Sequence, residues 1–537
     1  MANRRYAFLK SADGETVPAI VLPSGDTRPL HSMVDPKREA ARLVSTINED
    51  TGLVVFLGLG GGFAPEAALT HTAARVIVID FNREGVAELL SSKDYTPLLK
   101  NERFCLLTDP ACDEIKKTIL EQYKPALCGG IKTIPLRTRT EFDLPLFDAA
   151  AGAIQEAIET VSSDYSVQAH FGRRWFSNII RNIKNAKITP KNSFKEKFLS
   201  PVNEAAIVAA GPSLDMQITS LAECKSRQAF VICSDTALPV LLHHGIEPDA
   251  AVSIDCQHIS YYHFMGYSRN PRNIPLVLDI ASPPLLSRLS PSPVFFSSGH
   301  PLARYVSAHW QPFPYLDTSG GNVTYACLSL AENLGARRIT LFGADFSYVN
   351  SRTYARGTYI YPFFEKKQNR LSPAEALFSA FLYRSPFLPP ENEEKCQNKN
   401  YHETSQLRFY RKKLEEKAAA MDAQISCAKG LGAPVNLFKS HNSTIKLAET
   451  YAPAKKTDKS GVDFLEQYRG DIAALPQAKG ENYFGRLSAE EKQVFTTLLP
   501  LAAAIKHRSH GLKTCNLIEK VKLFCTEEID RVLALPV

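Results

Sequence analysis

The sequence predicts an α/β protein with two Rossmann-like domains followed by a helical region. Two observations predict this fold class: apolar runs enter glycine turns at residues 51–63 and 205–214, and later apolar runs end at acidic residues. With 537 residues, 44% of them hydrophobic, the chain is long enough for several cores. The predicted parts are an N-terminal Rossmann-like domain (1–150), a helical connection (151–195), a central α/β domain (196–445) and a C-terminal helical domain (446–537).

The N-terminal glycine turn is the first candidate for a nucleotide site. An apolar run leads into Gly58-x-Gly60-Gly-Gly, and the next apolar run ends at Asp80. The interval from Gly58 to Asp80 is close to the roughly twenty residues between a phosphate-loop glycine and a ribose-binding acid. The glycine spacing differs from the dinucleotide pattern, however, and no catalytic group follows. We therefore favour a structural or acceptor-binding domain, with a dinucleotide or S-adenosylmethionine site as the alternative.

The second glycine turn, Gly211-Pro212-Ser213, is the stronger candidate. The preceding run, Ala-Ala-Ile-Val-Ala-Ala, has the composition of a strand that is covered on both faces. Gly211 permits close approach of a ligand to the backbone, and Ser213 supplies a hydroxyl. Amides at the start of a following helix would donate to an anion. The sequence therefore predicts a phosphate-binding turn here.

Acidic residues end several of the strands predicted after this turn. Asp235, Asp255 and Asp345 each follow an apolar run. Ligands of an open parallel sheet bind outside the carboxyl ends of the strands, so we expect these side chains at one crevice. A single aspartate also caps helices or closes turns, and this structural interpretation stays open for each of them.

A second polar turn is predicted at Thr318-Ser319-Gly320. It opens a helix with apolar spacing, which Gly335 ends before the strand that leads to Asp345. Its hydroxyls and free backbone amides suit a phosphate or a ribose.

Three motifs together resemble the motility accessory factor family. They are Gly-Pro-Ser-Leu at 211–214, Pro-Asp-x-x-Val-Ser-Ile-Asp at 248–255, and the stretch from Thr-Ser-Gly to Gly-x-Asp-Phe at 318–346. These bacterial proteins are implicated in flagellin glycosylation with nonulosonic acids of the pseudaminic or legionaminic type. Their central domain is similar to the archaeal 6-hydroxymethylpterin diphosphokinase and, more distantly, to bacterial sialyltransferases that use CMP-sialic acid. The resemblance implies a sialyltransferase-like Rossmann-type fold for the central domain.

The resemblance also implies which residues bind the nucleotide-activated sugar. The turn at 211–213 and the loop at 318–320 would hold the nucleotide from two sides. Asp235 and Asp255 stand where the sialyltransferases use asparagine, and a carboxylate accepts from ribose hydroxyls or a cytosine amine but repels phosphate. The nucleotide-sugar site implied in this way comprises Gly211, Pro212, Ser213, Asp235, Asp255, Thr318, Ser319, Gly320 and Asp345.

Three further residues take the catalytic roles in this resemblance. Tyr348 and Tyr354 are placed like two tyrosines that hydrogen-bond the leaving phosphate, which a phenol does without adding charge. His402 lies where a histidine takes the proton of the acceptor hydroxyl. The alternative is structural: an aromatic-rich loop for the tyrosines and a solvated loop for the histidine.

The function implied is an inverting glycosyltransferase that moves a nonulosonic acid from its CMP donor to Ser or Thr hydroxyls of flagellin. We expect no cofactor and no metal, because the central region has no Asp-x-Asp motif and no Cys/His spacing typical of zinc. Two alternatives remain. One is a diphosphokinase that uses ATP and Mg²⁺ on a pterin-like alcohol, and the other is a non-catalytic protein that binds flagellin or a nucleotide.

Charge and composition limit the partners. A net charge of +7 suits an anionic donor, and no basic run or nucleic-acid-binding motif predicts a polynucleotide partner. No segment is long enough to cross a membrane, and the start lacks the apolar stretch of a signal peptide. Eleven scattered cysteines suit reduced thiols, so we expect a cytoplasmic protein. The C-terminal helices would pack on the central domain, recognise flagellin or mediate self-association into a homo-oligomer.

Overall fold

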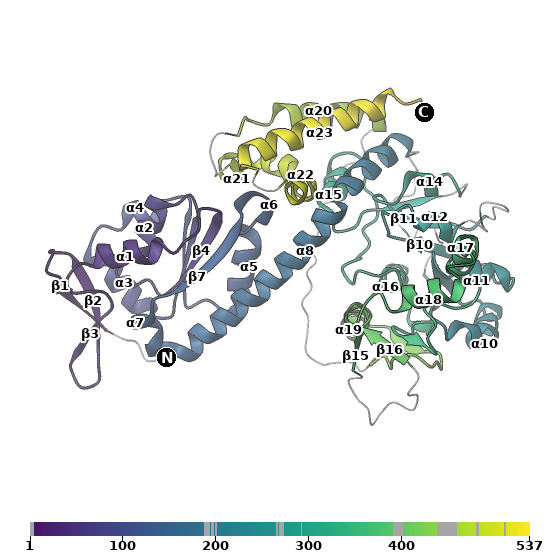
Figure 1. Cartoon of the computed structure of the whole chain (residues 1–537), viewed down its shortest axis with the longest axis horizontal. Coiled ribbons are helices and arrows are strands. Elements are labelled where there is room, and N and C mark those ends of the chain that lie inside the picture. The colour runs from purple at the N-terminus through teal and green to yellow at the C-terminus, as the bar shows by residue number, and fades with distance from the viewer. Residues whose placement is uncertain are drawn as a thin grey trace. The chain divides into compact units, whose positions relative to one another are not determined.

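The computed structural model describes residues 5–186, 194, 198, 201–264, 267, 273–290, 293–389, 401–437, 459–478, 483–509 and 512–536. The chain forms two compact units (Figure 1): unit 1 comprises Met1–Arg173 with Asp471–Cys525, and unit 2 comprises Arg174–Gly470 with Thr526–Val537. Helix α8 (Leu144–Asn185) begins in unit 1 and ends in unit 2. The C-terminal helices, which are divided between the units, are α20 (Gly461–Ala474), α21 (Tyr483–Arg486), α22 (Ala489–Arg508) and α23 (Thr514–Ala534).

Unit 1 is built on a parallel sheet with the strand order β6-β5-β4-β7. The strands are β4 (Thr51–Leu57), β5 (Arg75–Asp80), β6 (Phe104–Thr108) and β7 (Gly130–Pro135). An antiparallel sheet of β1 (Tyr6–Lys10), β2 (Thr16–Val21) and β3 (Thr27–Pro29) precedes them. The helices are α1 (Pro36–Val44), α2 (Phe63–His71), α3 (Arg83–Ser92), α4 (Thr96–Leu99), α5 (Cys112–Gln122), α6 (Pro125–Cys128) and α7 (Arg137–Thr140).

Side chains of this sheet alternate between two cores. Val54 and Phe56 pack with α1 and α2 on one face, whereas Leu53 and Val55 pack with α5 and α8 on the other. Because successive residues of a strand point to opposite faces, a parallel sheet covered on both faces needs apolar residues throughout. This requirement explains the unbroken apolar run before Gly58.

Unit 2 contains a parallel sheet with the order β12-β11-β10-β9-β8-β13-β17. The chain runs outward from β8 to β12 and then returns to β13 on the other side of β8, so the strand order reverses between β8 and β13. The strands are β8 (Glu204–Val208), β9 (Phe230–Ser234), β10 (Ala250–Ser253), β11 (Leu276–Asp279), β12 (Val294–Phe296), β13 (Arg338–Phe342) and β17 (Gln424–Cys427).

Both faces of this sheet are also covered by helices. Ala206 and Val208 pack with α10 (Leu214–Ser226) and α11 (Leu238–His243), whereas Ala205 and Ile207 pack with α16 (Val323–Asn333) and α19 (Ser405–Ala420). The α/β class predicted from the sequence is therefore confirmed, with parallel sheets in both units.

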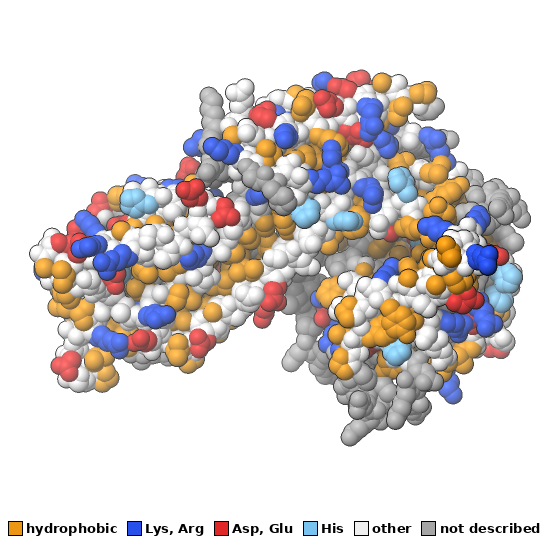
Figure 2. Space-filling model, in the orientation of Figure 1, with side chains coloured by type: hydrophobic (Ala, Val, Ile, Leu, Met, Phe, Trp, Pro, Cys, Tyr) orange, Lys and Arg blue, Asp and Glu red, His pale blue; other side chains and the backbone are white. Residues whose placement is uncertain are grey.

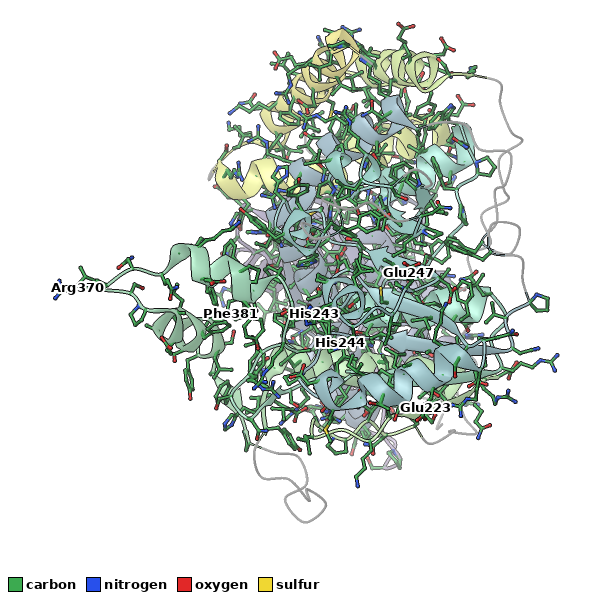
Figure 3. All side chains as sticks on the ribbon, turned by 90° about the vertical axis from the view of Figure 1, so that its right-hand side faces the viewer. Glu223, His243, His244, Glu247, Arg370 and Phe381 are labelled. Carbon is green, nitrogen blue, oxygen red and sulfur yellow. The ribbon has the colours of Figure 1, made fainter. Side chains whose placement is uncertain are left out.

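Shorter elements surround the carboxyl edge of the sheet in unit 2. A small antiparallel sheet has the order β14-β16-β15, with β14 (Tyr348–Val349), β15 (Phe387–Leu388) and β16 (Tyr401–Thr404). Helices α17 (Ile360–Lys367) and α18 (Ala374–Leu382) form a hairpin, and Figure 3 shows Arg370 at its outer end. The other helices are α12 (Ser260–His263), α14 (Pro284–Ser287) and α15 (Pro301–His309).

Basic and acidic side chains lie beside each other over both units on the face that Figure 2 shows. This mixture agrees with the small net charge of the sequence. None of the helices in the described part of the chain combines the length and the hydropathy needed to cross a membrane.

Candidate functional site at the carboxyl edge of the central sheet

The predicted turn Gly211-Pro212-Ser213 lies at the point where the strand order reverses, because it follows β8 and Asp345 follows β13. Ser213 N donates to Asp345 Oδ2 at 2.7 Å, and Gly211 N donates to Gly343 O at 2.9 Å. A Cβ on Gly211 would lie 2.4 Å from Gly343 O. Glycine is therefore needed at 211 for the two strand ends to close on each other.

These contacts use groups that the sequence assigned to a bound phosphate. The Ser213 amide faces the Asp345 carboxylate, and Ser213 Oγ accepts from Leu431 N at 2.8 Å. Burial raises the pKa of Asp345, although the hydrogen bonds from Ser213 oppose this shift. A donor phosphate at this turn would have to take the place of the carboxylate. The role of the turn in donor binding stays a prediction.

A cavity of ≈ 240 Å³ lies on the β13 side of this turn. Its lining includes Gln217, Asp345 and residues between Cys427 and Val435. None of the lining residues follows β9 or β10. The cavity is therefore separate from the aspartates that end those two strands.

Asp235 is buried at the end of β9 and held by several donors. It is 1% exposed and accepts from Ser253 Oγ at 2.7 Å and from Thr236 N at 2.7 Å. His263 Nδ1, at the end of α12, lies 3.3 Å from Asp235 Oδ1. Burial alone would raise the pKa of Asp235, but His263 and the hydrogen bonds outweigh it and lower the pKa. Asp235 is thus an ionised carboxylate in a fixed orientation.

Asp255 follows β10, the strand next to β9, so the structure brings these two predicted residues together. It is partly buried and accepts from Gln257 N at 2.9 Å. Burial raises the pKa of Asp255, and the negative charge of Asp235 raises it further. The two carboxylates are therefore unequal: Asp235 holds its charge, and Asp255 takes up a proton more readily.

Tyr348 and His402 lie opposite each other in the small sheet of unit 2. Strand β14 pairs antiparallel with β16, and the register places Tyr348 across from His402. Residues directly opposite in an antiparallel pair share a face and contact each other. The His402 ring stacks on Phe387, with ring centroids 4.6 Å apart. The structure thus joins two residues of the predicted catalytic set, whose catalytic roles stay predictions.

Tyr354 completes that set and brings in a residue to which the sequence gave no role. It is partly buried and interacts electrostatically with Tyr348, Tyr359 and Asp235. Burial raises the pKa of Tyr354 well above its usual range, so its phenol remains a hydrogen-bond donor. The Tyr359 ring lies 6.2 Å from Tyr354 and 4.5 Å from His263, measured between centroids. Tyr359 and His263 are thus members of the site that sequence reasoning missed.

The loop Thr318-Ser319-Gly320 is fixed by Tyr325, which lies in the first turn of α16. Tyr325 OH donates to Asp317 Oδ2 at 2.8 Å, and Ser319 N donates to Asp317 Oδ1 at 3.0 Å. A Cβ on Gly320 would lie 2.2 Å from the Tyr325 ring, so only glycine lets the ring pack against the loop. Thr318 is partly buried, Gly320 is buried and Ser319 is exposed. Ser319 is therefore the loop side chain that a ligand reaches most readily.

Tyr410 of α19 packs against this loop and interacts electrostatically with Asp255. A Cβ on Gly321 would lie 3.1 Å from the Tyr410 ring. Burial raises the pKa of Tyr410, and the charge of Asp255 adds to the shift. The phenol thus lies against the polar loop and within electrostatic range of the carboxylate that ends β10. Tyr410, in the charged helix that follows His402, also went unnoticed in the sequence.

The N-terminal candidates Gly58, Gly60 and Asp80 do not form an open site. Asp80 is 0% exposed, and Arg139 donates to its Oδ1 from Nε at 3.0 Å and from Nη2 at 2.8 Å. A Cβ on Gly60 would lie 2.4 Å from His31 Nε2, and one on Gly58 would lie 2.9 Å from Arg139 Cγ. Side chains of the protein therefore fill the space beside this turn, which favours its structural interpretation.

Comparisons with known proteins agree with this architecture. Residues 177–351 match the family model described as 6-hydroxymethylpterin diphosphokinase MptE-like. An uncharacterized protein of Treponema pallidum (strain Nichols) is 40% identical over 120 residues, which are 22% of this chain and 42% of the relative. Another from the same strain is 32% identical over 187 residues, which are 34% of this chain and 85% of the relative.

The same fold has been solved for a protein of another bacterium. The structure of the MAf glycosyltransferase from Magnetospirillum magneticum AMB-1 superposes with a TM-score of 0.57 and 13% sequence identity. The superposition covers 98% of this chain and 91% of that one. The fold is therefore shared over nearly the whole length of both proteins.

The fold and the family model together define a doubly wound α/β protein with an MptE-like domain. The chain belongs to the same family as the treponemal protein of which it covers 85%. The resemblance to the motility accessory factor family, predicted from the sequence, is confirmed by the MptE-like match and the shared fold.

Proposed function

We propose that this protein is a glycosyltransferase that moves a nonulosonic acid from a CMP-activated donor to Ser or Thr hydroxyls of flagellin. The main support for this proposal is the grouping of carboxylates and phenols at the carboxyl edge of the central sheet. Asp235 and Asp255 end neighbouring strands, and the phenols of Tyr354 and Tyr359 interact electrostatically with Asp235. Carboxylates suit ribose hydroxyls and a cytosine amine, and protonated phenols suit a phosphate that gains charge as it leaves.

The proposed reaction is a displacement at the anomeric carbon with inversion. The acceptor oxygen bonds to that carbon while the bond to the CMP phosphate breaks. Tyr348 and Tyr354 would donate to the leaving phosphate, and His402, opposite Tyr348, would take the acceptor proton. Ser319 would close the donor site from the loop. The proposal requires no cofactor or metal and includes a cytoplasmic location, with which the free thiols of the described cysteines agree.

Calorimetric titration with CMP, with and without Mg²⁺, tests the donor site first. We expect metal-independent binding that Asp255→Ala weakens by roughly tenfold or more, because a bond to a charged group is lost. Asp422→Ala is the matched control, since this aspartate of unit 2 is exposed and lies outside the site. Equal CMP affinity of wild type and Asp255→Ala would refute the proposal that the Asp255 carboxylate binds the donor.

A transfer assay tests the acceptor. Purified flagellin is incubated with a CMP-activated nonulosonic acid and the protein, and its intact mass is measured. The proposal expects a mass gain of one or more sugar residues with wild type and a strong loss of this gain with His402→Asn. Sugar transfer that continues unchanged in His402→Asn would reassign the base, and no mass gain with wild type would refute flagellin as the acceptor.

The match to a pterin diphosphokinase model favours a second candidate function, transfer of diphosphate from ATP to a pterin-like alcohol. Such an enzyme would need Mg²⁺ with the nucleotide phosphates. Within the described residues, no group of three or more His, Cys, Asp or Glu side chains is placed to hold a metal ion. Mg²⁺-dependent binding of ATP without a response to CMP would support this candidate. Binding of neither nucleotide would favour a flagellin-binding accessory protein.

A further inference from the structure

His263 lies beside one carboxylate of the site, Asp235, and one of its tyrosines, Tyr359. It is the last residue of α12, and its side chain is 10% exposed. Its Nδ1 lies 3.3 Å from Asp235 Oδ1, and its ring centroid lies 4.5 Å from that of Tyr359. Nδ1 is buried, and among the residues that the structure describes the polar atom found close to it is Asp235 Oδ1.

Both carboxylates of the site act on His263. Asp235 faces it directly, and Asp255 interacts with it electrostatically from the end of β10. Burial raises the pKa of Asp255 and the charge of Asp235 adds to this, whereas His263 lowers it. A positive charge on His263 therefore interacts favourably with both carboxylates. From the segment before α17, Tyr359 presents a neutral ring.

An anionic donor meets an electrostatic obstacle at this site. Two carboxylates beside each other repel the phosphate of a nucleotide-activated sugar, and the repulsion grows as charge develops on the leaving oxygen. Phenols donate hydrogen bonds but supply no positive charge. Arg384 interacts with Tyr354 and Tyr359, but its side chain is exposed to solvent, which screens its charge.

We infer that the imidazolium of His263, oriented by Asp235, binds the phosphate of the CMP donor and stabilises it as a leaving group. The inference rests on the proposed function and adds a residue to it. As the anomeric carbon–oxygen bond breaks, its electron pair passes to the phosphate oxygen, which accepts a hydrogen bond from His263. The acceptor oxygen bonds to the anomeric carbon and releases its proton to His402. His263 keeps its own proton, so no further reactant is needed.

Asp235 acts in this step as a positioning residue. Ser253 Oγ donates to Asp235 Oδ2 at 2.7 Å, and Thr236 N and Oγ1 donate to Oδ1 at 2.7 and 3.1 Å, so the oxygen that faces His263 Nδ1 is held in place. The arrangement matches the general device in which a buried carboxylate fixes the orientation of a histidine and favours its charged form. Asp235 also offsets part of the imidazolium charge, so the free site avoids an isolated buried cation.

The test compares two ligands that differ in the phosphate. Calorimetry measures binding of a CMP phosphodiester, which does not titrate near neutral pH, and of cytidine. His263→Asn is too short to reach the phosphate and carries no charge. We expect it to weaken phosphodiester binding roughly tenfold or more and cytidine binding less than threefold. His243→Gln is the matched control, because His243 is exposed at the end of α11 (Figure 3).

A pH series on the wild type does not depend on how the variant folds. We expect phosphodiester affinity to fall as the pH rises, because a charged imidazole attracts the phosphate and a neutral one does not, with a smaller change for cytidine and no such change in His263→Asn. Parallel weakening of both ligands in the variant would show a structural role and overturn the inference. Affinity that is independent of pH in wild type, with unchanged binding by the variant, would overturn it while the glycosyltransferase proposal stands. Failure of wild type to bind either ligand would overturn both.

Discussion

The buried ion pair of unit 1 gives the sharpest test of the structural interpretation of the N-terminal glycine turn. Arg139 and Asp80 are both 0% exposed, and Arg139 donates twice to Asp80 Oδ1, at 2.8 and 3.0 Å. In Arg139→Met the carboxylate stays buried without its cation. Breaking a buried pair in this way costs about 3–5 kcal/mol, whereas replacing both partners is often nearly neutral. We therefore expect Arg139→Met to destabilise unit 1 strongly and Asp80→Asn/Arg139→Met to recover much of the loss.

Hydrogen exchange followed by mass spectrometry localises this effect. A loss of 3–5 kcal/mol corresponds to opening that is roughly two to four orders of magnitude more frequent. Amides of β4 and β5 should exchange faster by about that factor, while amides of β8–β10 should be unaffected. Arg28→Met is the control, since Arg28 pairs with Glu141 at 2.7 Å but is half exposed, and exposed pairs contribute about 0–1 kcal/mol. Unchanged exchange in Arg139→Met, or a double variant no better than the single one, would refute the reasoning.

Three further predictions concern the sheet of unit 2, and urea unfolding checks each of them. Gly211→Ala should destabilise by about 1–3 kcal/mol, because its Cβ would lie 2.4 Å from Gly343 O. Ser253→Ala should cost about 1–3 kcal/mol at pH 7 by removing a donor from Asp235. The pKa of Asp235 is lowered, because His263 and the hydrogen bonds outweigh the effect of burial. The ionised carboxylate therefore stabilises the fold above pH ~4. The destabilisation caused by Ser253→Ala should shrink as the pH falls through the lowered pKa of Asp235. Burial raises the pKa of Asp279 to about 6. The folded state therefore binds more protons than the unfolded state between pH ~4 and ~6, and the free energy of unfolding falls as the pH rises through that range. Asp279→Asn should remove this fall and stabilise the protein by up to roughly 2–3 kcal/mol at pH 7.

The sheet was predictable from the sequence because its signal is local. A parallel strand covered on both faces must be apolar at every position, so the runs that form β8, β9, β10 and β13 could each be recognised alone. The chain order then placed Asp235 and Asp255 at neighbouring strand ends, where the structure has them. The sequence also pointed to Gly211 and Gly320, as residues that let a ligand approach the backbone. In the structure each glycine instead makes room for a neighbour within the protein: Gly211 for the Gly343 carbonyl and Gly320 for the Tyr325 ring.

The parts of the site that the sequence did not give depend on contacts between distant segments. His263 was one of many histidines until α12 placed it 3.3 Å from Asp235. Tyr410 could be connected with Asp255 only through the packing of α19. The same limit applies to Asp80, whose partner Arg139 is 59 residues away in the chain. A spacing that fits a ribose-binding acid fits a buried ion pair equally well, because only the partner distinguishes them.

The two glycine turns share one device, and the difference between them bears on function. In each turn a backbone amide donates to an aspartate at or just after the end of a neighbouring strand: Leu59 N to Asp80 and Ser213 N to Asp345, at 2.8 and 2.7 Å. A carboxylate of the protein thus accepts from a backbone amide of the turn in both places. Arg139 secures Asp80 through two hydrogen bonds, so a competing anion would have to break a buried ion pair.

Asp345 is held less firmly than Asp80. Burial raises the pKa of both aspartates, but no ion pair to Asp345 is found in the described part of the chain, so a displacement of this carboxylate breaks hydrogen bonds and no ion pair. Under the proposed function, the CMP-activated donor approaches the Ser213 amide at the point where the strand order reverses. The same sequence pattern therefore gives a turn closed by a buried ion pair in unit 1 and a turn closed by hydrogen bonds in unit 2, which is why we propose donor binding at the second turn and not at the first.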